Sequence, residues 1–326
     1  MMREVQALGW SVRHHRLADG FPFPDEAGRQ HADAVLGALP DGALTLVDGL
    51  ALGVLPEAAG RHADRLRLVG LVHHPLAAET GLSEAQRSFL VTSEVDALAA
   101  TRHIIVTSPF TATALAGYGV TPDRVTTILP GTDAAPPARG SAEGDGGPEL
   151  ALLSVGSLTP RKGHDVLLTA LARLVDRDWH LTLAGGARDA ETAGQIENII
   201  RHKALSSRVT LQGEVDQATL THLYDRADLF VLASHYEGYG MVFAEALARG
   251  LPILGTTGGA IPTTVPADAG LLVPPGDVEA LAAALARLMD EPALRHCLRQ
   301  GALAARAALP GWPDSARDFA AVLERL

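Results

Sequence analysis

The sequence repeats one pattern along most of its length: a short apolar run, a turn of small or polar residues, and a longer segment whose apolar residues recur at helical spacing. Short apolar runs are typical of strands buried on both faces of a parallel sheet, with the intervening helices covering those faces. Within residues 11–131 the runs are SVRHHRL, LTLVDGLA, LRLVGLVHH, HIIVTS and VTTIL. Further on they are LALLSVGS, WHLTLAGG, RVTLQGEV, DLFVLAS, LPILGT and AGLLVPP. This alternation predicts a series of β-α-β units.

A stretch without periodicity, DAAPPARGSAEGDGGPE, separates the two series, and its Pro, Gly and acidic residues predict a linker. We therefore expect two doubly wound, Rossmann-like α/β domains over residues 1–133 and 149–312, joined by a linker over 134–148. The last segment, 313–326, has the pattern of an amphipathic helix and is expected to pack back on the first domain. REVQALG near the start also reads as a helix, so the first domain is expected to lack the strand that usually opens such a fold.

The net charge of the chain argues against anionic macromolecules and membranes as binding partners. With 27 Lys and Arg against 38 Asp and Glu, the net charge is −11, so we expect no basic face for nucleic acid or an anionic membrane. No apolar run reaches the roughly 18 residues of a transmembrane segment, and no signal peptide is seen, so a cytoplasmic location is expected. The one cysteine, Cys297, has no second thiol to pair with and is expected to be a buried small residue in a helix.

Two carboxylates lie around the turn HYEGYGMVFAEALARG, residues 235–250. An apolar strand precedes it and an almost wholly apolar helix follows. A helix N-terminus at the carboxyl edge of a parallel sheet favours an anion such as phosphate, and Gly238 and Gly240 allow a close backbone approach. Glu245 lies one turn into the helix and leans toward the same end. Because carboxylates repel phosphate, we expect Glu245 to accept hydroxyl protons of a ribose and Glu237 those of a sugar.

Plainer interpretations remain open for each residue. Glu245 could pair with Arg249 four residues on, and Glu237 could be a solvated loop acid. In a second loop, VGSLTPRKGHDVLL, Arg161 and Lys162 would supply cations for a diphosphate, or Lys162 could be a solvated surface cation. The order of residues there is not that of a Walker loop. The turn TTGGAIP either lines the same crevice or is only a tight turn.

Together these motifs resemble a known family. EGYGMVFAEALARGLPILGT is similar to the E-x7-E signature of the retaining glycosyltransferases of family 4, which have the two-Rossmann GT-B fold. VGSLTPRKG, LQGEV, GGAIP, GLLVPPGD and LPGTD resemble other motifs of that family in the same order. The resemblance implies roles for Glu237 on the donor sugar, for Lys162 and Arg161 on the diphosphate, and for Glu245 on the ribose. It further implies diphosphate contacts from Gly238, Tyr239, Gly240, Met241 and Val242, and base contacts from Gly213, Glu214 and Val215.

Two further residues bear on this resemblance. Ser157 stands where the family often has an arginine, so Arg161 is expected to substitute for it. In LVHHPL, His73 and His74 end a strand and are expected at a cleft between the domains. A metal-binding pair is disfavoured because adjacent residues of an extended chain point to opposite faces. A purely structural histidine is the alternative, whereas the resemblance implies that His73 contacts the reacting sugar.

The resemblance implies transfer of a sugar from a nucleotide-diphosphate sugar to a hydroxyl of a small-molecule or glycan acceptor, with retention of anomeric configuration. The leaving diphosphate would help to deprotonate the acceptor, so neither a metal nor a further cofactor is expected. A nucleotide-sugar-binding protein with weak or no catalysis and a sugar-nucleotide epimerase remain alternatives. A nicotinamide-dependent enzyme is disfavoured because no G-x-G-x-x-G follows the first apolar run.

Overall fold

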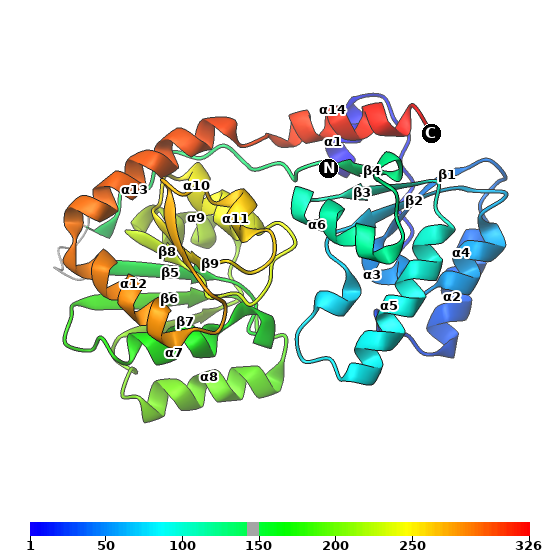
Figure 1. Ribbon diagram of the computed structural model, residues 1–326. Coiled ribbons are helices and arrows are strands. Elements are labelled where there is room, and N and C mark those ends of the chain that lie inside the picture. Colours follow the sequence, from blue (N-terminus) through cyan, green and yellow to red (C-terminus); the bar gives the residue numbers. More distant parts are fainter. Residues whose placement is uncertain (142–149) are drawn as a thin grey trace. The chain divides into compact units, whose positions relative to one another are not determined.

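The computed structural model describes residues 1–141 and 150–326. The chain divides into two compact units, each an α/β layered structure around a parallel sheet (Figure 1). The first unit comprises Met1–Gly131 and Pro310–Leu326, and the second comprises Thr132–Leu309. The expected class, a pair of doubly wound α/β domains, is therefore confirmed.

The first unit has four parallel strands in the order β1-β2-β3-β4. Their bounds are β1 Leu44–Asp48, β2 Arg67–Val72, β3 His103–Val106 and β4 Val125–Thr127. Its helices are α1 Met2–Ala7, α2 Glu26–Gly37, α3 Gly49–Leu52, α4 Pro56–His62, α5 Glu84–Ala99, α6 Pro109–Ala114 and α14 Trp312–Leu323. As expected from the sequence, residues near the start form a helix, and β1 is the first strand among the described residues.

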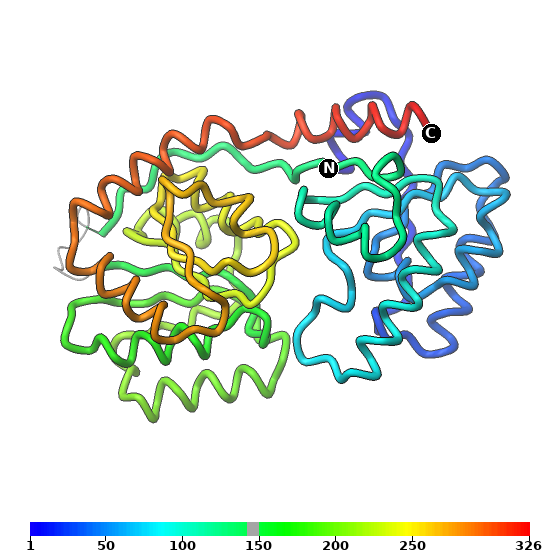
Figure 2. Tube along the Cα trace, in the orientation of Figure 1, coloured from blue at the N-terminus to red at the C-terminus, as the bar shows by residue number. Residues whose placement is uncertain are grey.

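Both faces of this sheet are buried because successive strand residues point to opposite sides. Leu68 and Ile104 pack in the core formed with α2, α4 and α5. Their neighbours Val69 and Ile105 pack on the opposite face, against α1 and α14. The tube in Figure 2 shows the first and last parts of the chain lying together in this unit. The last helix thus belongs to the first unit.

The segment SVRHHRL forms no strand, contrary to the sequence-based expectation. Its two apolar side chains, Val12 and Leu17, are five residues apart, an odd spacing that puts them on opposite sides of an extended chain. Val12 packs with Val69 and Ile105, whereas Leu17 packs in the core on the other face of the sheet. The segment therefore passes from one face of the sheet to the other instead of joining its hydrogen-bonded ladder.

The second unit has six parallel strands in the order β10-β9-β8-β5-β6-β7. Their bounds are β5 Leu150–Val155, β6 Trp179–Ala184, β7 Val209–Gly213, β8 Leu229–Val231, β9 Ile253–Thr256 and β10 Gly270–Val273. The helices are α7 His164–Leu171, α8 Ala190–His202, α9 Gln217–Arg226, α10 Met241–Ala248, α11 Ile261–Thr264, α12 Val278–Asp290 and α13 Pro292–Ala305. Each of α8, α9 and α12 begins after an aspartate whose side chain accepts a backbone N–H of the first turn.

Helices again cover both faces of the sheet. Leu152 of β5 packs with α7, α8 and α12, whereas Leu153 packs with α9, α10 and α13. Cys297 lies in a helix, α13, as expected, but it is exposed. The expectation of a buried cysteine was wrong because residue 297 lies on the outer side of this amphipathic helix, next to buried Leu298.

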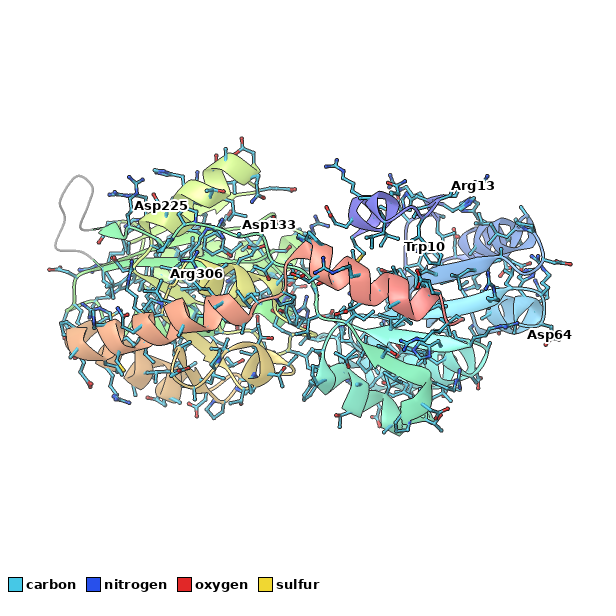
Figure 3. All side chains as sticks on the ribbon, turned by 90° about the horizontal axis from the view of Figure 1, so that it is seen from above. Trp10, Arg13, Asp64, Asp133, Asp225 and Arg306 are labelled. Carbon is cyan, nitrogen blue, oxygen red and sulfur yellow. The ribbon has the colours of Figure 1, made fainter. Side chains whose placement is uncertain are left out.

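The expected linker is described only over residues 134–141, and residues 142–148 lie outside the described part. Residues 134–140 form no helix or strand, yet they are bound to the second unit. Ala138 N donates to Arg249 O over 2.8 Å, and Arg139 forms an ion pair with Asp225. Arg306 on the segment after α13 also donates to the carbonyl of Ala135; Asp225 and Arg306 are labelled in Figure 3. This part of the chain is therefore fixed to the second unit.

The order of strands in the second unit reverses between β5 and β8. From β5 the chain adds β6 and β7 on one side, then returns to add β8, β9 and β10 on the other. In open parallel sheets, the loops at the carboxyl ends of the two strands flanking such a reversal diverge and leave a crevice for ligands. The loops after β5 and β8 contain Arg161, Lys162 and Glu237. No helix among the described residues is long and apolar enough to cross a membrane.

Candidate functional site

The loops after β5 and β8 are held directly against each other. The first loop ends in a short 3-10 turn, Pro160–Lys162, followed by Gly163 at φ 61°. A Cβ atom on Gly163 would lie 2.1 Å from the carbonyl oxygen of Ala233, so this close approach requires glycine. The N–H of His235 also donates to Arg161 O over 2.8 Å. Backbone contacts alone therefore bring the two basic residues beside residues 235–237.

Glu237 is buried at the centre of a cluster of polar groups, with 6% of its surface exposed. Lys162 Nζ lies 2.6 Å from Oε1, and Arg161 NH1 lies 3.2 Å from Oε2. Ser234 Oγ donates to Oε1 over 2.7 Å. Burial opposes the negative charge, but Lys162 and then Arg161 outweigh it, so the pKa of Glu237 is lowered. Neither Glu237 as a solvated loop acid nor Lys162 as a solvated cation fits this geometry.

Arg161 makes a second contact to the same loop, because NH1 also donates to the carbonyl of Tyr236 over 2.9 Å. The turn after β9 contacts the backbone of the loop that contains Glu237. Ala260 N donates to Glu237 O over 2.8 Å, and Glu237 forms an isolated parallel bridge with Gly259. The TTGGAIP turn therefore serves as the backbone support of Glu237, beyond simply reversing the chain.

Helix α10 begins next to this cluster. Its N-cap is Gly240, at φ 88° and ψ 58°, with no side-chain cap. Phe243 and Ala244 donate back to Gly240 O, whereas the N–H groups of Met241 and Val242 lie outside the helical ladder at the helix end. Such N–H groups, together with the helix dipole, favour an anion. The preceding residues Gly238 and Tyr239 lead directly from Glu237 into this helix end.

Glu245 lies on the same helix, and its carboxylate is held by Tyr224 of α9. The phenol hydroxyl donates to Glu245 Oε2 over 2.9 Å. Arg249 does not pair with this carboxylate as the i,i+4 alternative required; its guanidinium donates to the backbone carbonyl of Glu245 over 3.2 Å. Burial raises the pKa of Glu245, and the bond from Tyr224 and the charge of Arg249 reverse this only in part.

The residues expected around a base lie farther along the sheet. Gly213 ends β7, and Glu214 and Val215 follow it at the same carboxyl edge, two strands away from β5. Gly213 O accepts a hydrogen bond from Gly185 N over 2.8 Å. The role of Gly213, Glu214 and Val215 on a base stays a prediction.

His73 belongs to the first unit, at the carboxyl end of β2. Its Nε2 lies 3.1 Å from Asp48 Oδ2, at the end of β1, and half of its side-chain surface is exposed. Its carbonyl accepts hydrogen bonds from Thr107 over 3.2 Å and from Thr111 over 3.1 Å. His74 points elsewhere, with Nε2 3.7 Å from Glu79. The backbone and ring of His73 are thus both held in place within this unit.

Sequence reasoning missed three residues that hold the candidate site residues: Ser234, Tyr224 and Asp48. Ser234 lies three residues before Glu237, so its proximity was visible in the sequence. Tyr224 and Asp48 contact Glu245 and His73 across 21 and 25 residues, and no local pattern marks such contacts. Among the described residues, no group of three or more His, Cys, Asp or Glu could hold a metal ion.

The part of the chain that contains this site also matches a known protein family. The family described as "Glycosyl transferases group 1" matches residues 142–304, half of the chain. The chain belongs to this family. The match covers the loops after β5 and β8 and the whole of α10, so the Arg161–Glu237–Lys162 cluster and Glu245 lie in its shared part.

Two curated relatives illustrate the similarity. The chain is 34% identical over 208 residues to D-inositol 3-phosphate glycosyltransferase of Thermomonospora curvata, a match covering 57% of this chain and 48% of that protein. It is 35% identical over 171 residues to MMP alpha-(1->4)-mannosyltransferase of Mycolicibacterium hassiacum, covering 51% and 40% respectively. The chain thus spans about half the length of the curated relatives it matches.

Solved structures confirm the GT-B type of fold. Sucrose-phosphate synthase from Thermosynechococcus elongatus superposes with a TM-score of 0.79 at 25% identity, over 96% of this chain and 84% of that one. Anabaena Alr3699/HepE in complex with UDP and glucose superposes with a TM-score of 0.75 at 20% identity, over 92% and 82%. At 20% identity, the similarity to HepE supports the fold alone.

Proposed function

We propose that this glycosyl transferases group 1 member moves a sugar from a nucleotide-diphosphate sugar to a hydroxyl group of a small-molecule or glycan acceptor, with retention of anomeric configuration. The observation that carries the proposal is the buried Arg161–Glu237–Lys162 cluster beside the N-terminus of α10, at the strand-order reversal. Two cations against one carboxylate leave net positive charge where a diphosphate would lie, and the amides of Met241 and Val242 add donors.

The state of Glu237 supports a front-face route without a protein nucleophile. Its Oε1 accepts bonds from Lys162 and Ser234, and its Oε2 faces Arg161, so both oxygens are already engaged. A carboxylate with a lowered pKa between two cations is a weak nucleophile and a weak base. Its suitable role is to accept hydrogen bonds from hydroxyl groups of the donor sugar, while the leaving diphosphate takes the proton of the acceptor hydroxyl.

The remaining candidate residues take consistent roles. Glu245 accepts hydrogen bonds from the ribose hydroxyl groups, and Gly213, Glu214 and Val215 flank the base. Gly238, Tyr239 and Gly240 bring the backbone to the diphosphate. We assign His73 to the reacting sugar, through its ring or its carbonyl. The nucleotide sugar is the donor substrate, and neither a metal nor a further cofactor is assigned.

Binding identifies the donor first. Thermal unfolding is measured with UDP, GDP, ADP and their sugars, because a ligand at about 100 times its dissociation constant adds roughly 2.7 kcal/mol. Transfer is then measured with the stabilising sugar nucleotide and an acceptor panel that includes D-inositol 3-phosphate, named in several relatives. NMR of the product reports the anomeric configuration. Conversion of the donor without acceptor would indicate an epimerase, and binding without any turnover would indicate an idle binding protein.

Two variants separate the proposed roles of the carboxylates. Glu245→Ala is expected to weaken nucleoside diphosphate binding, because it removes the partner of the ribose. Glu237→Ala is expected chiefly to abolish transfer, because it removes the partner of the reacting sugar. Calorimetric titration with the diphosphate and a transfer assay are run on both variants. An equal loss of diphosphate affinity in the two would contradict the assignment.

A further inference from the structure

Tyr224 of α9 is completely buried, and its hydroxyl contacts α10. It donates to Glu245 Oε2 over 2.9 Å and lies 3.3 Å from the carbonyl of Val242. A phenol has one proton to donate, and the shorter contact is to the charged acceptor, which forms the stronger bond. Tyr224 therefore holds one specific oxygen of Glu245.

The ring of Tyr224 has no freedom to release that oxygen. The Phe230 ring stacks with it at 6.0 Å between centroids, and Phe230 in turn meets Phe243 edge-on at 5.5 Å. The Arg249 guanidinium covers the Tyr224 ring at 4.5 Å from its centroid. Burial, followed by the charge of Glu245, raises the pKa of Tyr224 well above its usual value. The hydroxyl thus stays protonated and remains a donor.

Other groups near Glu245 do not orient its carboxylate. Arg249 donates to the backbone carbonyl of Glu245, and its positive charge, over the face of the Tyr224 ring, lowers the pKa of Glu245. Asp133, on the segment leading toward β5, opposes the charge of Glu245. Among the side chains that the structure describes, Tyr224 supplies the hydrogen bond to the Glu245 carboxylate.

We infer that Tyr224 is a positioning residue for nucleotide recognition: its hydroxyl fixes Glu245 Oε2 so that Oε1 is presented to a ribose hydroxyl. The inference rests on the proposed function, since it concerns how the same carboxylate selects a ribose. A carboxylate free to rotate loses part of its interaction with the hydroxyl to the entropy of being ordered, whereas one held by a rigid donor does not.

The test compares the wild type with Tyr224→Phe, which keeps the ring, its stacking and the Arg249 contact. Each protein is titrated calorimetrically with the preferred nucleoside diphosphate and with its 2′-deoxy and 3′-deoxy forms. The wild type is expected to prefer the ribose form over at least one deoxy form by about 10-fold, the value of one hydrogen bond to a charged group. In Tyr224→Phe this preference should fall to about 2-fold, with little change in deoxy affinity. Tyr118→Phe in the first unit serves as the control and should keep the wild-type preference.

The pH dependence gives a second readout that a merely structural role would not change. The bond from Tyr224 lowers the pKa of Glu245 against the effect of burial, with Arg249 also lowering it and Asp133 raising it. Without the hydroxyl, Glu245 should bind its proton more tightly. Affinity for the ribose form should therefore decline on acidification at a higher pH in Tyr224→Phe than in the wild type, while the deoxy form shows no such displacement.

The outcomes separate this inference from the proposed function. If Glu245→Ala loses the ribose preference while Tyr224→Phe keeps it, the positioning role is wrong and the donor site stands. If Tyr224→Phe weakens ribose and deoxy forms equally, the hydroxyl is only structural and the inference is again overturned. A wild type that binds no nucleoside diphosphate overturns both. Unfolding curves of each variant confirm that the compared proteins are folded.

Discussion

Glu237 and Glu245 lie eight residues apart, one in the loop after β8 and one on α10, and the protein treats them in opposite ways. Glu237 is placed between Lys162 and Arg161, and its pKa is lowered. Glu245 faces a phenol hydroxyl, and burial raises its pKa. The first carboxylate has its charge neutralised inside the protein, whereas the second keeps a charge that is only partly compensated.

This difference indicates how each carboxylate can meet a ligand. A carboxylate fixed by two cations and a hydroxyl contributes geometry, because its position and ionisation are already determined. A carboxylate with one neutral donor gains more from a new hydroxyl, because its burial leaves it short of partners. The first therefore suits a reacting sugar that must be held in one pose, and the second suits a ribose that supplies binding free energy.

The largest expected effect concerns stability. Glu237→Gln keeps the shape but removes the buried negative charge that faces the partly buried Lys162 and Arg161, so the free energy of unfolding of the second unit should fall by about 3 kcal/mol, the lower end of the range for breaking a buried ion pair. Glu245→Gln keeps an acceptor for Tyr224 and should cost about 1 kcal/mol or less. Urea unfolding is followed by the fluorescence of buried Trp179 after replacing Trp10 and Trp312 with Phe. Equal costs in the two variants would remove the contrast.

The next effect is on ligand binding. Lys162→Ala should reduce the binding free energy of the preferred nucleoside diphosphate by about 1.5–3 kcal/mol, the range for a hydrogen bond to a charged group. Lys203, the other lysine of the chain, is exposed at the C-cap of α8, so Lys203→Ala is a matched control and should bind normally. Unchanged affinity in Lys162→Ala would move the diphosphate contact to Arg161 or to the backbone.

A smaller effect is expected from the support of Glu237. Gly259 has φ 63°, and a Cβ there would lie 2.3 Å from the Glu237 carbonyl oxygen. Gly119 has φ 72° with open space around it, so Gly119→Ala should cost only the left-handed strain of about 1–2 kcal/mol. Gly259→Ala should cost more in unfolding assays and lower the transfer rate, with diphosphate affinity little changed. Two identical unfolding costs would show that the turn does not fix Glu237.

The smallest effect is a pH dependence of opposite sign for the two residues. The lowered pKa of Glu237 stabilises the fold above about pH 4.5, and this contribution is lost as the pH falls through the folded-state pKa. The raised pKa of Glu245 means that stability is lost as the pH rises through its folded-state value. The free energy of unfolding of the wild type minus that of Glu245→Gln should therefore decrease as the pH rises above about 4.5. Buried Glu94 in the first unit has a pKa raised to about 7. It titrates in both proteins, so its contribution to the free energy of unfolding is absent from the difference between them.

The second unit could be predicted from the sequence in most of its parts. Its six apolar runs became strands, because short apolar runs bounded by turn residues are a local signal. The sequence assigned Lys162 to a diphosphate and Glu237 to a sugar, and it did not predict the ion pair between them. What brings them together is a backbone approach at Gly163, and local pattern does not reveal which carbonyl a glycine must pass.

The sequence-based prediction fails where contacts between residues distant in sequence determine the structure. The run at residues 11–17 has apolar residues suited to either face of a sheet, and only the location of the two cores determines that it passes the sheet edge. The alternative of an i,i+4 pair between Glu245 and Arg249 fails for a similar reason, because the hydroxyl of buried Tyr224 binds the carboxylate while the guanidinium bonds to the backbone. Such competition between partners distant in sequence has no local signature.

The division of the chain also has a consequence for biosynthesis. The second unit is one uninterrupted stretch, Thr132–Leu309, whereas the first needs residues from both ends of the sequence. Val69 and Ile105 are covered by Ala316, Phe319 and Val322 of α14. Because a ribosome makes only about 5–20 residues per second, this face of the first sheet is covered only by the N-terminal segment around α1 for about 10–40 seconds, until α14 has been made. The part of the protein that is translated first is therefore the last to be completed.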